Sequence, residues 1–117
     1  MWSRARTGLK ALLALVLIGA VVRHVAALAG FIPAIDPPIR HLAWIGINLL
    51  LLYGFLTDAR WLALALLPVT AQQLTSHGMS VWRWVAGVAP FDGISLVVVI
   101  ALGLGWWLLL ARPKGNS

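Results

Sequence analysis

Residues 40–77 constrain the fold more than any other part of the chain, because two long apolar runs there are separated by one short turn. The first run covers residues 42–56, and the chain turns within residues 57–60. A helix needs about 20 apolar residues to cross a hydrocarbon layer about 30 Å thick, and both runs approach that length. The pattern therefore predicts a helical hairpin in a membrane, with His41 and His77 at the same edge.

The composition indicates a membrane protein. Of the 117 residues, 62% are apolar and only 10% are charged, whereas soluble domains carry about 25% charged residues. Basic residues lie at the ends of apolar runs and never form a run of several, so we expect the lipid bilayer as a partner and no nucleic acid. The chain has no Cys, which excludes disulfides, thiol redox chemistry and Cys-ligated metals.

These runs predict an all-α fold, a polytopic membrane protein with four transmembrane helices in one antiparallel bundle. The predicted helices cover about residues 9–30, 39–56, 61–75 and 93–111, with an interfacial segment at 76–91. Three prolines in residues 31–39 predict an extended connection. Pro68 is expected to bend the third helix and to leave the Leu64 carbonyl without its usual partner, and Asp92 is expected to cap the last helix.

The N-terminal segment has two interpretations. Residues 1–29 resemble a cleaved signal peptide, with a basic start, an apolar core and a small-x-small site at 27–29. Arg23 and His24 are unusual within a cleavage region, and apolar sequence continues beyond them. This favours an uncleaved first helix, and the later topology is the same in either case.

The distribution of basic residues predicts the orientation. One side would carry six of them, namely Arg4, Arg6, Lys10, Arg60, Arg112 and Lys114. The other side would carry three, namely Arg23, Arg40 and Arg83. Because loops rich in Lys and Arg stay in the cytoplasm, both termini are predicted to be cytoplasmic, and we expect the chain in a bacterial inner membrane.

Polar side chains gather near the predicted outer edge and form the candidate ligand-binding pocket. Its residues are Arg23, His24, Arg40, His41, Asn48, Gln72, Gln73, His77 and Asp92. Every histidine of the chain is among them, whereas the inner half of the helices has almost no polar residue. Such a set suits a polar headgroup, for example a quinone carbonyl or a lipid phosphate.

Arg23 is the most constrained member of this pocket. It lies about 20 Å along its helix from Lys10, at about 1.5 Å per residue, and therefore below the outer surface. An arginine inside a membrane usually faces protein and finds a partner. We expect Asp92 to be that partner, with Asp36 as the second choice and an exposed loop carbonyl as a further alternative.

Three functions are consistent with these residues. The first is a non-enzymatic binding or accessory module that holds a headgroup in the polar pocket. The second is a structural subunit of a larger membrane complex or homo-oligomer, in which Asn48, Thr70 and Gln73 only form interhelical hydrogen bonds. The sequence contains no Gly-rich phosphate loop, Gly-x-Ser-x-Gly motif or paired carboxylates, so no catalytic residue is predicted.

The third function is a membrane redox protein that binds haem or a divalent metal. His41 and His77 on facing helices would supply two axial haem ligands, and His24 would complete a three-histidine metal site. No His-x-x-x-His or Glu-x-x-His spacing supports this function.

Overall fold

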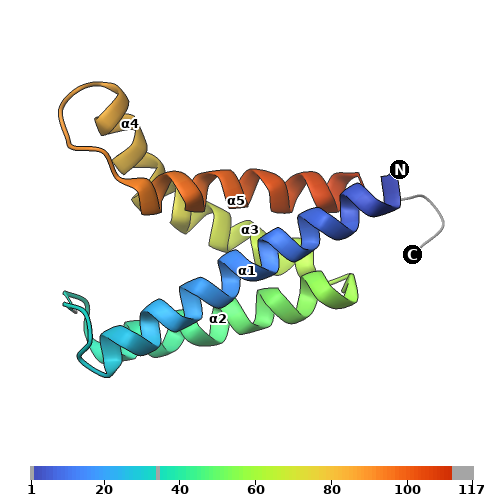
Figure 1. The fold of residues 1–117 in the computed structure, drawn as a ribbon, viewed down its shortest axis with the longest axis horizontal. Coiled ribbons are helices and arrows are strands. Elements are labelled where there is room, and N and C mark those ends of the chain that lie inside the picture. The colour runs from blue at the N-terminus through green and yellow to red at the C-terminus, as the bar shows by residue number, and fades with distance from the viewer. Residues whose placement is uncertain (1, 34, 112–117) are drawn as a thin grey trace. The chain divides into compact units, whose positions relative to one another are not determined.

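The computed structural model describes residues 2–33 and 35–111, and all regular secondary structure in these ranges is helical (Figure 1). In chain order the helices are α1 (Trp2–Leu28), α2 (Pro38–Thr57), α3 (Leu62–Gln73), the π-helix η1 (Leu74–Gly78), α4 (Met79–Val85) and α5 (Gly93–Leu110). The chain divides into two compact units, Met1–Leu62 and Ala63–Ser117, and each is described by itself.

Three helices of the described ranges are long and apolar enough to cross a membrane. They cover Ser3–Leu28, Pro38–Thr57 and Gly93–Leu110. This finding supports the predicted integral membrane protein and its all-α fold. The α3 helix is not among the three, because its 12 residues extend only about 18 Å at about 1.5 Å per residue.

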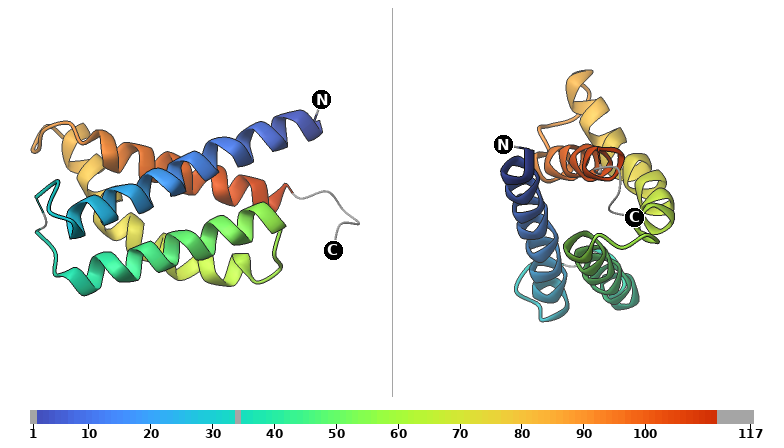
Figure 2. Two further views of the ribbon diagram at one scale, coloured as in Figure 1. Left: turned by 60° about the horizontal axis from the view of Figure 1, so that its bottom comes forward. Right: turned by 90° about the vertical axis from the view of Figure 1, so that its right-hand side faces the viewer.

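In the first unit, α1 and α2 run in opposite directions. Arg6 and Lys10 in the first turns of α1 contact Asp58 at the end of α2. At the other end of the pair, His24 of α1 contacts His41 in the first turns of α2. The two helices lie side by side and are joined by the loop that follows α1 (Figures 1 and 2). They form a helical hairpin with a histidine end and an Asp58 end.

Local backbone chemistry explains where this hairpin turns. Gly30 adopts φ +83°, a left-handed conformation that glycine reaches at no steric cost. Two hydrogen bonds close the end of α1, from the Phe31 N–H to the Ala26 carbonyl and from the Gly30 N–H to the Ala27 carbonyl. The α2 helix then begins with Pro38, whose missing N–H leaves no unpaired donor in a first helical turn.

A close backbone approach fixes the Asp58 end of α2. Gly54 is buried, and a Cβ atom there would lie 2.8 Å from Leu62 Cδ1 and 3.0 Å from Trp61 Cη2. Leu62 is only 1% exposed, so its side chain has little room to move away. Trp61 also stacks on Tyr53 of α2, with ring centroids 6.5 Å apart. The segment that follows α2 therefore packs back onto the helix because position 54 carries no side chain.

In the second unit the helical path continues further than the sequence predicts. The third helix was expected to end at residue 75, but η1 and α4 follow α3 without any non-helical residue before Val85. Residues 74–85 contain no proline, so nothing stops the helix there. The α4 helix ends at Val85 and is followed by Gly87 with φ +77°, just as Gly30 follows the end of α1. The predicted interfacial segment is thus helical over its first part.

Pro68 lies within α3, which stays α-helical on both sides of it. Because proline has no N–H, the Leu64 carbonyl lacks the donor that any other residue at position 68 would supply. The bend expected at Pro68 stays a prediction.

The α5 helix returns along this helical path in the opposite direction. Its early residue Ser95 contacts His77 of η1, and its late residue Trp106 donates a hydrogen bond of 2.7 Å from Nε1 to Thr70 Oγ1 in α3. Thr70 therefore forms an interhelical hydrogen bond, which is the structural role considered for it. Its partner lies on the last helix of the chain.

Replacing Gly54 with Ala should destabilise the first unit, because the added Cβ would overpack Leu62 and Trp61. Overpacking of this kind costs about 1–3 kcal/mol of unfolding free energy. The measurement is reversible unfolding of the detergent-solubilised protein in a denaturing detergent. Gly46→Ala is the matched control, because nothing lies within 4 Å of a Cβ at position 46 of the same helix. Equal stability of the two variants would contradict the close approach.

Candidate functional site

The histidine end of the hairpin carries a bonded pair of imidazoles. His24 Nδ1 lies 2.9 Å from His41 Nδ1, and the ring centroids are 5.2 Å apart with planes tilted by 52°. His41 is only 8% exposed, whereas His24 is half-buried. The Nε2 atom of His41 is buried and has no hydrogen-bond partner among the described residues. The structure thus brings together two of the predicted pocket residues and leaves one of their nitrogen atoms unsatisfied.

Two arginines flank this histidine pair in the sequence. Arg40 precedes His41, and its Nη1 lies 3.7 Å from Asp36 Oδ1, with both side chains 49% exposed. Arg23 precedes His24, is exposed, and forms no ion pair with a described residue of its own unit. The predicted pair of Arg23 with Asp36 is therefore not formed. The alternative pair with Asp92, a residue of the second unit, stays a prediction.

The register of the hairpin gives the separation of these groups from the Asp58 end. Along α2, Arg40 lies 18 residues before Asp58, which corresponds to about 27 Å at about 1.5 Å per residue. This distance is close to the roughly 30 Å of a bilayer's hydrocarbon layer. Arg23 precedes His24 in α1 and therefore lies at the histidine end of this length. The expected depth of Arg23 below the outer surface stays a prediction.

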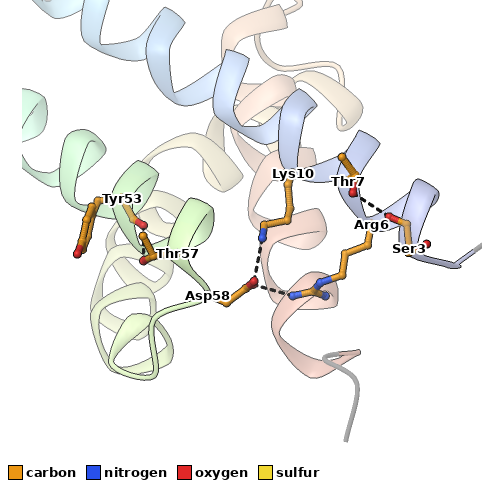
Figure 3. Close-up of polar contacts among 7 residues, drawn as sticks. All are labelled: Ser3, Arg6, Thr7, Lys10, Tyr53, Thr57 and Asp58. Carbon is orange, nitrogen blue, oxygen red and sulfur yellow. Dashed lines mark hydrogen bonds and ion pairs between the residues drawn. The ribbon is translucent and has the colours of Figure 1, made fainter. Parts of the chain in front are cut away.

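The Asp58 end holds a three-residue ion cluster (Figure 3). Arg6 Nη2 donates to Asp58 Oδ1 at 3.0 Å, and Lys10 Nζ donates to Asp58 Oδ2 at 2.9 Å. Partial burial alone would raise the pKa of Asp58, but the hydrogen bonds from Lys10 and Arg6 outweigh burial and lower it. The cluster ties the start of α1 to the end of α2. Sequence reasoning missed it, although Asp58 is the only acid on the predicted basic side.

In the second unit, His77 is part of a chain of hydrogen bonds with Ser95 and Asp92. Asp92 caps α5 as predicted, because its Oδ1 accepts the Ser95 N–H at 3.0 Å. Its Oδ2 accepts the Ser95 hydroxyl at 2.6 Å, and His77 Nδ1 lies 2.8 Å from that hydroxyl. These bonds, first the hydroxyl and then the backbone N–H, lower the pKa of Asp92.

The direction of the hydrogen bonds among His77, Ser95 and Asp92 decides what these side chains can do chemically. Ser95 has one hydroxyl proton and directs it to Asp92, so the Ser95 oxygen accepts the Nδ1 proton of His77. A serine nucleophile would instead give its proton to the histidine, so this arrangement supports the start of α5 rather than acyl transfer. Ser95 is 1% exposed. The sequence signal that would have found it is the Asp-x-x-Ser spacing of a helix N-terminus.

The remaining predicted pocket residues bond locally. Asn48 Nδ2 donates to the Trp44 carbonyl of its own helix at 2.7 Å. Gln73 Nε2 donates to Gln72 Oε1 at 3.0 Å. These bonds satisfy amide groups without another helix. A pocket shared by residues of both units stays a prediction.

Neither unit assembles the predicted metal site. His24 and His41 form a pair in the first unit, and His77 belongs to the second. Among residues 2–33 and 35–111, no three His, Asp or Glu side chains are arranged to hold a metal ion. The haem and metal hypotheses therefore gain no support from the arrangement of side chains within a unit.

Comparison of the chain with protein-family models, curated proteins and solved structures found no match.

Asp58→Asn should weaken the first unit, since it removes the charge and keeps a residue type that tolerates the left-handed backbone at φ +51°. The Asp58 side chain is 44% exposed, so solvent screening limits the expected loss of unfolding free energy to about 1 kcal/mol or less at pH 7. Because the folded pKa lies below the ordinary value of 3.8, this stabilisation is present above pH 3.8 and disappears as the pH falls through the folded pKa.

The measurement is unfolding free energy against pH for the wild type, Asp58→Asn and the control Asp36→Asn, whose ion pair is longer. The difference between Asp58→Asn and the wild type should shrink at acid pH. A difference that is independent of pH would contradict the role of the Asp58 charge.

Proposed function

We propose that this chain is a small integral membrane protein that acts as a non-enzymatic binding or accessory module, with its site at the histidine end of the α1–α2 hairpin. One observation carries the proposal. His41 is almost completely buried, bonds through Nδ1, and has a buried Nε2 without a partner among the described residues. Buried polar atoms are nearly always hydrogen-bonded in native structures, so this exception indicates a functional group rather than a packing residue.

The charge at this end of the hairpin supports a binding role. Two guanidinium groups, those of Arg23 and Arg40, lie next to the histidine pair in sequence, and Asp36 is the one acid of the connecting loop. The Asp36–Arg40 contact is long and half-exposed, so it neutralises Arg40 only partly. A ligand that presents oxygen acceptors fits this set of donors. No step of bond making or breaking is needed for such a role.

For the membrane arrangement we propose four spans in an antiparallel bundle, with both termini on the cytoplasmic side of a bacterial inner membrane. The fourth span would be the continuous helical path of α3, η1 and α4, which have 12, 5 and 7 residues. Such a path extends about 36 Å at about 1.5 Å per residue, enough for the hydrocarbon layer. The Gln72–Gln73 and His77–Ser95 bonds support it, because polar side chains in hydrocarbon need internal partners.

Reporter fusions test this arrangement, since four spans place both termini in one compartment and three spans place them in opposite compartments. A reporter after Ser117 and one before Met1 should both be cytoplasmic, and a reporter inserted at Gly87 should be periplasmic. The insertion site follows the end of α4 and interrupts no helix. A periplasmic C-terminus together with a cytoplasmic N-terminus would overturn the fourth span.

Loss of bound ligand on His41→Ala tests the binding function. The full-length protein is extracted in a mild detergent, and the small molecules and lipids that remain bound are identified by mass spectrometry. We expect the wild type to retain a species with an oxygen-rich headgroup that His41→Ala loses while its circular dichroism stays helical.

Asp58→Asn is the control, because it weakens the opposite end of the same hairpin and should retain the ligand. If all three proteins carry the same molecules, the histidine end is structural, and the role of a subunit in a larger assembly replaces the binding role.

A further inference from the structure

The histidine pair has a restricted set of protonation states. A hydrogen bond between two Nδ1 atoms needs one N–H donor and one lone-pair acceptor, so the two neutral rings must be different tautomers. In one arrangement His24 donates, and His41 carries its proton on Nε2. In the other His41 donates, and His24 carries its proton on Nε2. The surroundings of the two Nε2 atoms decide between them.

The buried Nε2 of His41 favours the second arrangement. This atom has no partner among the described residues, and an unpaired buried N–H is rarer in native proteins than an under-satisfied acceptor. His41 therefore carries its proton on Nδ1 and donates it to His24. The proton of His24 then lies on Nε2, on the less buried ring of the pair. His24 presents a fixed N–H donor at the histidine end of the hairpin.

The depth and charge of this end indicate what that donor meets. Arg40 lies about 27 Å along α2 from Asp58 at about 1.5 Å per residue, and this is close to the thickness of a hydrocarbon layer. The histidine end is thus at one boundary of the hydrocarbon layer, next to the lipid headgroups, when the Asp58 end is at the opposite boundary. Arg23 is exposed and has no ion pair with a described residue of its unit. A guanidinium binds phosphate through paired N–H bonds and gains less from a neutral carbonyl.

We propose that Arg23, His24 and Arg40 bind the phosphate of an anionic phospholipid headgroup, and that His41 is a positioning residue that fixes the tautomer of His24. The proposal rests on the proposed binding function and names its ligand class. Arg23 and Arg40 supply charge that no ordinary pH removes, and His24 Nε2–H supplies a hydrogen bond of fixed direction.

The ligand class is tested on the full-length protein labelled with ¹⁵N-histidine in neutral detergent micelles. Phosphatidylglycerol, phosphatidylcholine, inorganic phosphate and a neutral quinone are each titrated while the His24 ring signals are followed. Phosphatidylglycerol should move the His24 Nε2 signal at roughly tenfold lower concentration than phosphatidylcholine, because choline offsets the phosphate charge.

Arg23→Gln and Arg40→Gln should each weaken the phosphatidylglycerol response by roughly tenfold, the usual effect of one charge-assisted bond. Arg60→Gln is the matched control, because it removes the same charge from an exposed residue beyond the other end of α2 and should leave the response unchanged. Equal responses to the two phospholipids would overturn the proposal. A response to the quinone alone would overturn it too and would leave the binding function in place. Inorganic phosphate acting at the same concentration as phosphatidylglycerol would reject the lipid as the source.

The positioning role of His41 has its own readout. His41→Ala should give His24 a mixture of tautomers, seen in its ¹⁵N shifts, and a weaker phosphatidylglycerol response. His41→Asn should restore both, because an Asn amide N–H replaces the Nδ1–H of histidine. A single Nε2–H tautomer of His24 in the Ala variant would show that His41 does not fix it.

Discussion

Hydrocarbon offers no hydrogen bonds, and this constraint organises the polar side chains of the first unit. The Asp58 cluster and the histidine pair lie at opposite ends of one helical hairpin, separated along α2 by nearly the thickness of a hydrocarbon layer. Between them, the Asn48 amide donates a hydrogen bond to a carbonyl of its own helix. The hairpin is thus apolar along its length. At its two ends, polar contacts between the helices fix the register of α1 against α2.

The same constraint explains why the helices hold their polar side chains so close to their own backbone. Hydroxyl groups donate to the carbonyl four residues earlier at five positions, namely Thr7, Thr57, Thr75, Ser76 and Ser80. Such bonds satisfy a hydroxyl inside an apolar layer without a second helix. Hydrogen bonds between helices, such as the one from Trp106 to Thr70, have a different effect, because they determine which helix faces pack together.

The sequence predicted the parts of this fold that depend on chain-local signals. Apolar runs placed the spanning helices, the prolines placed the loop before α2, and the cap at Asp92 follows from its position before an apolar run. The His24–His41 contact depends instead on how two helices are rotated against each other, and the residue pattern predicts only that both histidines lie at one edge. Ser95 was missed because a serine within an apolar run has no periodic signal.

Two further differences have physical causes of the same kind. The helix beyond residue 75 continues to Val85 because neither Pro nor a left-handed Gly interrupts it, although its polar residues suggested an end. Arg23 is predicted to pair with Asp92 or Asp36, because its position along α1 places it below the outer surface. In the hairpin it precedes His24 of the histidine pair and forms no ion pair with Asp36, whose partner is Arg40, and the pair with Asp92 stays a prediction.

The π-helix η1 determines how the chain would respond to the insertion or deletion of a residue in this segment. A π turn accommodates one residue more than an α turn, so it shifts the angular phase of everything after it by about 100°, the rotation per residue of an α-helix. Loss of a single residue within Leu74–Gly78 would let the segment relax into an uninterrupted α-helix and leave α4, with Trp82 and Trp84, facing the same side, because the π turn already absorbs the rotation of the extra residue. Rewinding the full-length segment as an α-helix would instead turn α4 by about 100°, so the π turn itself sets the face that α4 presents.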